Sequence, residues 1–288
     1  MVRRLKMSEE QQGCNHDCEH CANKTETCEA DLRFAEEQKL IKHKIVVLSG
    51  KGGVGKSTMA VNLAYGLAAR GFKVGLVDVD LHGPSIPTML GIKDSTVYAR
   101  DERLLPVECE GIDVMSVEFF LPDKDAAVVW RGPMKYGAIK QFLQETYWGE
   151  LDYLVVDCPP GTGDEPLGVC QMLQGEKHAL VVTTPQEVSA ADVRKSLDFC
   201  RLLPLPVLGV VENMSGFVCP HCGEVTYIFK QGGGEKLAEK AKVPFLAKIP
   251  IEPGVGASSD EGKPFMKAIP DSVAAKAFAA VVDAAAKL

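Results

Sequence analysis

Lys44-Ile-Val-Val-Leu-Ser49 runs directly into Gly50-Lys-Gly-Gly-Val-Gly-Lys-Ser-Thr58, and this segment indicates the fold of the chain. The first part is a continuous apolar run, which predicts a β-strand buried on both faces. The second part matches G-x-x-x-x-G-K-[ST], a loop whose glycines let backbone N–H groups surround phosphate oxygens. A helix expected at Ser57–Arg70 directs its positive end at the same place. This order of elements predicts a nucleoside-triphosphate site, and a glycine-rich turn without a ligand is the alternative.

Each residue of this loop is a candidate nucleotide-binding residue: Gly50, Gly52, Gly53, Val54, Gly55, Lys56, Ser57 and Thr58. Lys56 is expected to reach the β- and γ-phosphates, and the Ser57 hydroxyl is expected to ligate Mg²⁺. No N-K-x-D motif of the kind that reads guanine follows the later strands, which favours ATP over GTP.

Carboxylates at the ends of neighbouring strands complete the predicted site. Asp157 closes Tyr153-Leu-Val-Val-Asp157 and is the residue expected to hold magnesium through water. The second strand ends in Asp78-Val-Asp80, and Asp80 is a candidate for positioning the attacking water. A solvated strand-end aspartate is the alternative for Asp80. The loop after Asp157 contains Gly161, which we expect to swing toward a γ-phosphate.

Strands and helices alternate through the rest of the chain, which predicts an α/β fold with a doubly wound, mostly parallel sheet. Further strands are expected at Lys73–Val77, Ile112–Val117, Tyr153–Val156, Ala179–Thr183, Val207–Val211 and Phe245–Ile249. Further helices are expected at Pro133–Tyr147, Pro166–Gln174, Val188–Leu203, Glu235–Lys242 and Ser272–Leu288. We expect residues 1–43 to form a cysteine-rich segment ending in a linker helix at Glu29–His43. Residues 44–288 would form the P-loop ATPase domain.

The composition limits the partners that the chain can have. The 288 residues carry a net charge of −7, which argues against bulk attraction to nucleic acid or to anionic lipid. No apolar run reaches the length of a membrane helix, and residues 8–13 are polar where a signal peptide has its apolar core. We therefore expect a cytoplasmic protein with neither a nucleic-acid nor a membrane partner.

Ten cysteines in a cytoplasmic protein are unsuited to disulfides, because the cytosol keeps thiols reduced. Cys219-Pro-His-Cys222, within a hairpin expected at residues 217–229, supplies two thiolates. Tetrahedral zinc and a [4Fe–4S] cluster each need four ligands, so one chain holds half a site. A two-fold homodimer would complete that site. His221 is a bystander in this interpretation, and zinc is the competitor of the cluster.

Lys51 is a second lysine inside the phosphate loop, and with it the loop resembles the deviant Walker A motif of the MinD/ParA group. From about Lys44 onward the chain most resembles the Mrp/ApbC family of iron–sulfur cluster carrier ATPases. The motifs that carry this resemblance are Asp78-Val-Asp-Leu-His-Gly-Pro-Ser85, Trp130-Arg-Gly-Pro-Met134, Asp157-Cys-Pro-Pro-Gly-Thr-Gly-Asp164, Glu212-Asn-Met-Ser-Gly216, Cys219-Pro-His-Cys222 and Gly232-Gly-Gly234.

The resemblance implies a role for several residues. Lys51 would reach the partner subunit's ATP, acting in trans as an arginine finger does. Asn213 and Pro250, in Ile249-Pro-Ile-Glu-Pro253, would lie around the adenine. Cys219 and Cys222 would ligate the cluster.

A second set of cysteines, Cys14, Cys18, Cys21 and Cys28, can close a complete site within one chain. Eukaryotic-type members of the family carry an N-terminal four-cysteine cluster, so a second [4Fe–4S] cluster is the preferred interpretation. The spacing departs from theirs, because the first cysteine is closer to the C-x-x-C. His16 and His20 lie among these cysteines, which leaves Cys₂His₂ zinc or a mixed site open, and a disordered tail with adventitious metal is the residual alternative.

These features together predict a homodimeric ATPase that carries an iron–sulfur cluster and passes it to apo-proteins. Two alternatives stay open. One is a spatial-regulator ATPase of the MinD/ParA type, which would need a basic surface or a basic amphipathic terminal helix. The other is a redox component with an iron–sulfur or zinc site, which would use ATP to drive electron transfer from its cluster.

Overall fold

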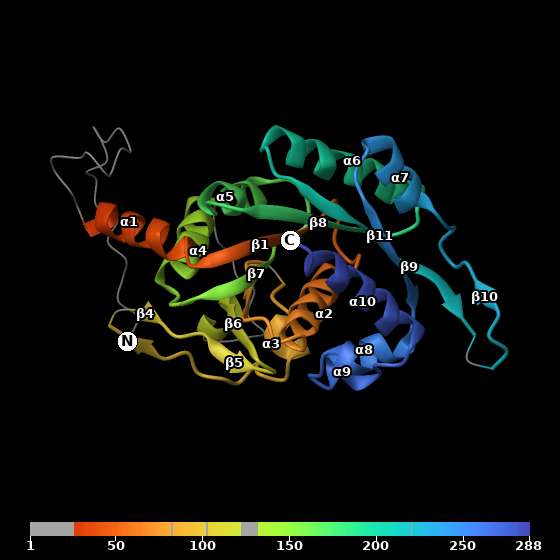
Figure 1. Ribbon diagram of the computed structural model, residues 1–288, viewed down its shortest axis with the longest axis horizontal. Helices are drawn as coiled ribbons and strands as arrows, with labels where there is room; N and C mark the ends of the chain where they lie inside the picture. Colours follow the sequence, from red (N-terminus) through yellow and green to blue (C-terminus); the bar gives the residue numbers. More distant parts are fainter. Residues whose placement is uncertain (1–25, 82, 102, 122–131, 220) are drawn as a thin grey trace.

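The computed structural model describes residues 26–81, 83–101, 103–121, 132–219 and 221–288 (Figure 1). A nine-stranded sheet has the order β10-β9-β8-β1-β7-β2-β6-β5, and β11 pairs with β9. Its strands are β1 (Ile41–Ser49), β2 (Val74–Asp78), β5 (Val107–Cys109), β6 (Ile112–Ser116), β7 (Leu151–Asp157), β8 (Lys177–Thr183), β9 (Val207–Val218), β10 (Val225–Thr226) and β11 (Phe245–Ile251). Only β5 and β10 pair antiparallel within this sheet. The predicted α/β fold with a mostly parallel sheet is confirmed.

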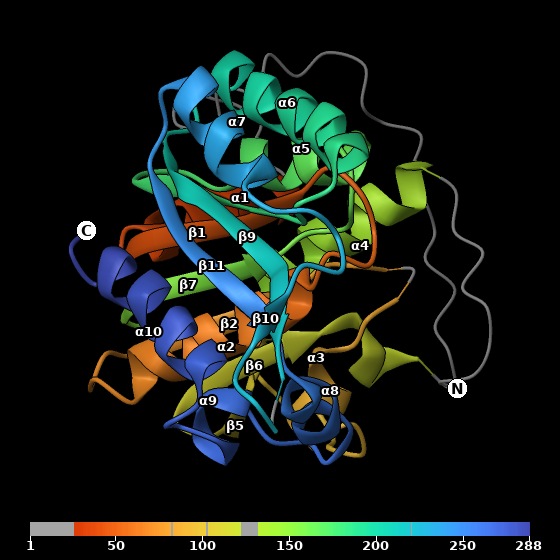
Figure 2. The same ribbon diagram turned by 90° about the vertical axis from the view of Figure 1, so that its right-hand side faces the viewer.

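Helices cover both faces of the sheet (Figure 2). They are α1 (Glu26–Gln38), α2 (Lys56–Ala68), α3 (Ile86–Met89), α4 (Gly132–Glu145), α5 (Asp164–Met172), α6 (Glu187–Leu202), α7 (Gly233–Ala241), α8 (Pro253–Asp260), α9 (Phe265–Ala268) and α10 (Val273–Ala285). A short 3₁₀ turn (Val117–Phe120) follows β6, and a separate two-stranded ribbon joins β3 (Ala99–Arg100) to β4 (Arg103–Leu104). No helix in the described ranges is both long and apolar enough to cross a membrane.

The apolar run of β1 divides its side chains between two cores. Ile45 and Val47 pack with α2 and α10 on one face, while Val46 and Leu48 pack with α4, α5, α6 and α7 on the other. All four side chains are buried, as expected for a central strand of a parallel sheet. Because β1 lies between β7 and β8, the loop after Ser49 emerges at the carboxyl edge of the sheet.

The prediction of a linker helix at Glu29–His43 is wrong about where the helix ends. The helix stops at Gln38, and β1 already begins at Ile41, which pairs with Leu151. Lys44 lies inside this strand and is buried, with its Nζ donating to the carbonyls of Gln38 and Ile41 at 3.0 Å each. The charged side chains of this segment therefore belong to a strand whose one buried lysine caps the preceding helix.

The strand predicted at Val207–Val211 is longer than expected, since β9 continues to Val218. Beyond the sheet it turns into the expected hairpin, in which Val225 pairs with Val218 and the backbone N–H of Cys219 donates to Glu224. Figure 1 shows this hairpin projecting from one end of the sheet. The cysteine pair is thus carried on a direct extension of a core strand.

Candidate nucleotide and cysteine sites

The phosphate loop lies where β1 ends and α2 begins, and it lines a pocket of about 300 Å³. The pocket residues are Ser49, Lys51, Gly52, Gly53, Val54, Gly55, Lys56, Ser57, Thr58, Asp80, Gly83, Ser85, Met89 and Pro160. Predicted loop residues from Gly52 to Thr58 are therefore brought together, and Asp80 from the second strand faces the same space. Gly50 lies just behind the loop, where an added Cβ would lie 2.5 Å from the backbone carbonyl carbon of Asp192 in α6.

The curvature of the loop depends on glycine at two positions. Gly53 and Gly55 have φ values of +74° and +86°, which are unfavourable for residues with a Cβ. A Cβ at Gly55 would also lie 2.2 Å from Nδ2 of Asn213. That Asn213 amide donates to the carbonyl oxygen of Val54 at 2.8 Å, so a residue of β9 holds the tip of the loop.

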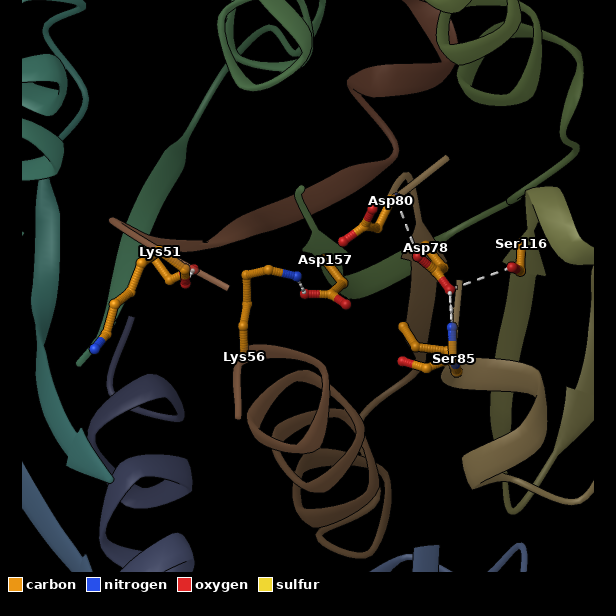
Figure 3. A network of polar contacts seen from close by, with 9 residues as sticks. Lys51, Lys56, Asp78, Asp80, Ser85, Ser116 and Asp157 are labelled. Atoms are coloured by element: carbon orange, nitrogen blue, oxygen red, sulfur yellow. Dashed lines mark hydrogen bonds and ion pairs between the residues drawn. The ribbon is translucent and has the colours of Figure 1, made fainter. Parts of the chain in front are cut away.

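Lys56 and Asp157 form a buried ion pair at the base of the pocket, with Nζ 2.6 Å from Oδ1 (Figure 3). Burial opposes the charge of Lys56, but the adjoining Asp157 carboxylate outweighs that effect and the pKa of the lysine is raised. Burial also raises the pKa of Asp157, although Lys56 and Ser57 oppose the shift. The other carboxyl oxygen, Oδ2, is buried and has no hydrogen-bond partner among the described residues.

This arrangement fits a hard divalent cation. A buried carboxylate oxygen without a donor, beside the hydroxyl of Ser57, offers the oxygen ligands that Mg²⁺ prefers. Ser57 and Asp157 are the residues that would hold the ion, as predicted from the loop motif and the strand end.

Asp78 is a buried carboxylate for which the sequence pattern predicted no role. It accepts hydrogen bonds from the backbone N–H groups of Asp80 (3.1 Å) and Ser85 (3.2 Å), and from the Ser116 hydroxyl (3.3 Å). Complete burial, and then the nearby charge of Asp157, raise its pKa to about 8. Asp78 thereby ties the loop that carries Asp80 to β2 and β6 (Figure 3). The signal in the sequence is the Asp-x-Asp pair with a serine seven residues after the first aspartate.

Lys51 extends away from the Lys56–Asp157 pair (Figure 3). Its Nζ contacts the Gln186 side-chain oxygen at 3.1 Å, just before α6. Lys51 therefore does not reach the base of its own pocket in this conformation.

The Cys219 and Cys222 thiols lie together in the projecting hairpin, Cys219 half-buried and Cys222 exposed. Hydrogen bonds from the backbone N–H groups of Cys222 and His221, and one from the Cys222 side chain, lower the pKa of the Cys219 thiol. Within the described ranges no three His, Cys, Asp or Glu side chains are grouped so that they could hold a metal. The structure thus brings two thiols together on one chain, and their role as cluster ligands stays a prediction.

The two residues predicted around the adenine, Asn213 and Pro250, lie on the neighbouring strands β9 and β11. Ile249, which precedes Pro250 in β11, pairs with Asn213 of β9, so these residues are neighbours. Glu212, also on β9, is fully buried and accepts from the backbone N–H groups of Gly234 (2.6 Å) and Gly232 (3.2 Å). The glycine-rich start of α7 is therefore fixed to the same strand.

The N-terminal cysteines are outside what the structure can test. Cys14, Cys18 and Cys21 lie outside the described residues, and Cys28 is placed only as a backbone position in α1. Their role as a metal site stays a prediction.

A family model described as "ParA: NUBPL iron-transfer P-loop NTPase" matches residues 40–286. The chain belongs to this family. The match covers the whole sheet with both the phosphate loop and the cysteine hairpin. Membership makes the pocket that of a P-loop NTPase, which agrees with the buried Lys56–Asp157 pair.

Individual relatives agree with the family assignment. An "iron-sulfur cluster carrier protein" of Saccharolobus solfataricus is 49% identical over 259 residues, which cover 90% of this chain and 88% of that protein. The "cytosolic Fe-S cluster assembly factor NUBP2" of Rattus norvegicus is 52% identical over 246 residues, covering 84% of this chain and 91% of that protein. The similarity therefore spans nearly the whole of each relative.

Two solved structures show the same fold. A nucleotide-binding protein of Archaeoglobus fulgidus in complex with ADP is 43% identical, with a TM-score of 0.74 over 82% of this chain and 93% of that chain. The cell division ATPase MinD of Pyrococcus furiosus is 27% identical, with a TM-score of 0.60 over 86% of this chain and 99% of that chain. The resemblance to MinD-like ATPases inferred from Lys51 is thus matched by the fold.

Proposed function

We propose that this protein is a cytoplasmic, homodimeric ATPase that carries a [4Fe–4S] cluster and transfers it to apo-proteins. The cluster is cargo, held between the two subunits by Cys219 and Cys222 of each. Membership of an iron-transfer NTPase family and close relatives named as iron–sulfur carriers support this proposal.

The observation that carries the proposal is the path of β9. Asn213 on this strand donates to Val54 in the nucleotide loop, and Cys219 follows its last residue. Five residues separate Asn213 from Cys219, and two of them, Met214 and Gly216, bend the strand with positive φ values of 57° and 88°. A change at the loop can therefore reach the cysteine pair along one short, continuous stretch of backbone.

The chemistry of the cysteine pair suits reversible cluster binding. A thiolate is the ligand form, and the backbone donors that lower the pKa of Cys219 favour that form. Cys222 is exposed at the hairpin, where a second subunit or an acceptor can approach. Four thiolates from two chains complete the ligand set that one chain lacks.

ATP hydrolysis in the nucleotide pocket drives the transfer of the cluster. Lys56 leaves Asp157 to contact the β- and γ-phosphates, and Ser57 with Asp157 would hold a magnesium ion, which would neutralise phosphate charge. Asp80 positions the attacking water, with its backbone held by Asp78. Lys51 moves from Gln186 to the ATP of the partner subunit, where its charge stabilises the transition state.

Asn213 and Pro250 are assigned to the adenine, beside the loop that Asn213 already contacts. A second [4Fe–4S] cluster is assigned to Cys14, Cys18, Cys21 and Cys28.

Anaerobic reconstitution with iron and sulfide tests the cargo site. The wild-type dimer should gain one [4Fe–4S] cluster that the Cys219→Ser/Cys222→Ser variant lacks, in addition to any N-terminal cluster that both retain. Iron, acid-labile sulfide and native mass are the measurements, and a Cys158→Ser variant, altered at a buried thiol in the core, is the control. Equal cluster content in wild type and the double variant, or zinc in place of iron, would contradict the assignment.

A further inference from the structure

A wide groove runs between α6 and α7, apart from the nucleotide pocket and the cysteine hairpin. Both views show the two helices side by side on one face of the sheet (Figures 1 and 2). The groove encloses about 1240 Å³, which exceeds the roughly 300–1,000 Å³ of small-molecule pockets. Its size therefore favours a macromolecular segment over a metabolite.

The rim of the groove is strongly basic. Five cations and one carboxylate line it, namely Arg194, Lys195, Arg201, Lys236, Lys240 and Asp198. Lys195 pairs with Asp192 at 3.5 Å, and Arg201 pairs with Asp198. The remaining three, Arg194, Lys236 and Lys240, are exposed and have no carboxylate partner in the described part of the chain. This concentration of positive charge contrasts with the net charge of −7 for the whole chain.

Helical spacing aligns these cations along the groove. Arg194 and Arg201 are two turns apart on α6, and Lys236 and Lys240 are one turn apart on α7. The floor between the two rows is apolar and consists of Leu197, Leu205, Val207, Leu237, Ala241 and Val243. The groove thus offers an apolar floor between two charged walls.

We propose that this groove is a docking site for an acidic amphipathic helix of a partner protein. One helix about 10 Å across would place its apolar face on the floor and its carboxylates against both walls. Nucleic acid is the other polyanion, but its phosphates would leave the apolar floor without a counterpart. That the partner is the acceptor of the cluster rests on the proposed function.

Each of the two helices that form the groove contacts an element of a functional site. On its α6 side, Asp192 packs against Gly50 of the nucleotide loop. On its α7 side, the helix begins at glycines bound by Glu212 of β9, the strand that leads to Cys219. A partner helix in the groove would lie against the two elements that frame the loop and the cysteine strand.

Fluorescence anisotropy on the full-length, cluster-free protein tests the docking site. The probe is a labelled synthetic peptide of about five helical turns with leucine on one face and glutamate on the other. A permuted peptide of equal composition and a short DNA duplex are the comparison probes. We expect binding of the amphipathic peptide that weakens as salt rises, with the permuted peptide at least about fivefold weaker.

Arg194→Glu/Lys236→Glu/Lys240→Glu should weaken peptide binding at least about tenfold. The matched triple variant Arg33→Glu/Lys276→Glu/Lys287→Glu alters exposed cations elsewhere and should change it less than about twofold. Unchanged thermal unfolding and ATP binding show that the groove variant is folded.

Three results would overturn the proposal. They are equal peptide binding by both triple variants, DNA binding without peptide binding, and loss of the dimer on light scattering in the groove variant alone. Because no cluster is present, none of these results depends on whether the protein carries iron.

Discussion

Nζ of Lys56 lies 2.6 Å from Oδ1 of Asp157, and both side chains are buried. The lysine that should bind phosphate is therefore held at the base of the pocket by the carboxylate that should hold magnesium. The attraction between them raises the pKa of Lys56 and opposes the rise in the pKa of Asp157, so each charge stabilises the other.

Replacing Lys56 should therefore affect stability as well as nucleotide binding. Lys56→Met leaves a buried carboxylate without its cation, which costs about 3 kcal/mol when a buried pair loses one partner. Lys56→Met/Asp157→Asn removes both charges and should recover most of that loss. Urea unfolding measures the stability, and binding of a fluorescent ATP analogue should be lost in both variants. A double variant no more stable than Lys56→Met would contradict a stabilising pair.

The trans role of Lys51 predicts complementation between two inactive variants. Lys51→Ala keeps its own phosphate site but lacks the lysine for its partner, and Lys56→Met has the reverse defect. A mixed dimer should regain one working site, with roughly half of the wild-type ATPase rate per dimer if all chains pair in this way. Steady-state phosphate release over a titration of one variant into the other is the measurement. Rates that stay at the sum of the two separate variants would place Lys51 in cis.

The hydrogen bond from Asn213 to the Val54 carbonyl predicts a modest effect on affinity. Asn213→Ala removes a bond worth about 1 kcal/mol, so ATP should bind about fivefold more weakly. Ser259→Ala is a matched control, because it removes a 2.8 Å side-chain bond to a backbone carbonyl in α8. Isothermal titration with a non-hydrolysable ATP analogue compares the three proteins. Equal affinity in all of them would show that Asn213 does not support the loop.

Lys44 predicts a pH dependence of stability. Burial lowers its pKa from 10.5 to about 8, so between these values the unfolded chain binds a proton that the folded chain has released. The contribution of Lys44 to the free energy of unfolding therefore rises as pH increases from about 8 to 10.5. Lys44→Met should lose this rise, whereas Lys276→Met, at an exposed lysine, should keep it. Urea unfolding at several pH values in this window checks the difference, and parallel curves for wild type and Lys44→Met would contradict it.

Much of the fold follows from local pattern. The apolar strands around the phosphate loop were predictable because a central parallel strand is buried on both faces and reads as an unbroken apolar run. The end of the first helix was not, because Lys42 and His43 resemble a solvated helix surface. The pairing of Ile41 with Leu151, which makes this segment a strand, is a contact across more than a hundred residues. The charges of neighbouring residues do not indicate a contact between such distant parts of the sequence.

The candidate site likewise contains residues that the sequence predicts and residues that it does not. Residues inside a motif, such as Lys56 and Cys219, were predictable from spacing. Asp78 and Glu212 were not, although both lie inside quoted motifs, because their partners are backbone N–H groups brought near by the fold. The basic groove combines two helices separated by β9, and the net charge of −7 gives no sign of it. Only the packing of α6 beside α7 assembles it.

The central claim is that nucleotide state controls the cluster held by Cys219 and Cys222. The direct test is the rate of cluster transfer from the loaded dimer to apo-aconitase, followed by recovery of aconitase activity without nucleotide, with ADP and with ATP. We expect ATP to change the wild-type rate at least severalfold and to leave the rate of loaded Lys56→Met unchanged. Equal transfer rates for the wild type in all three conditions would contradict it.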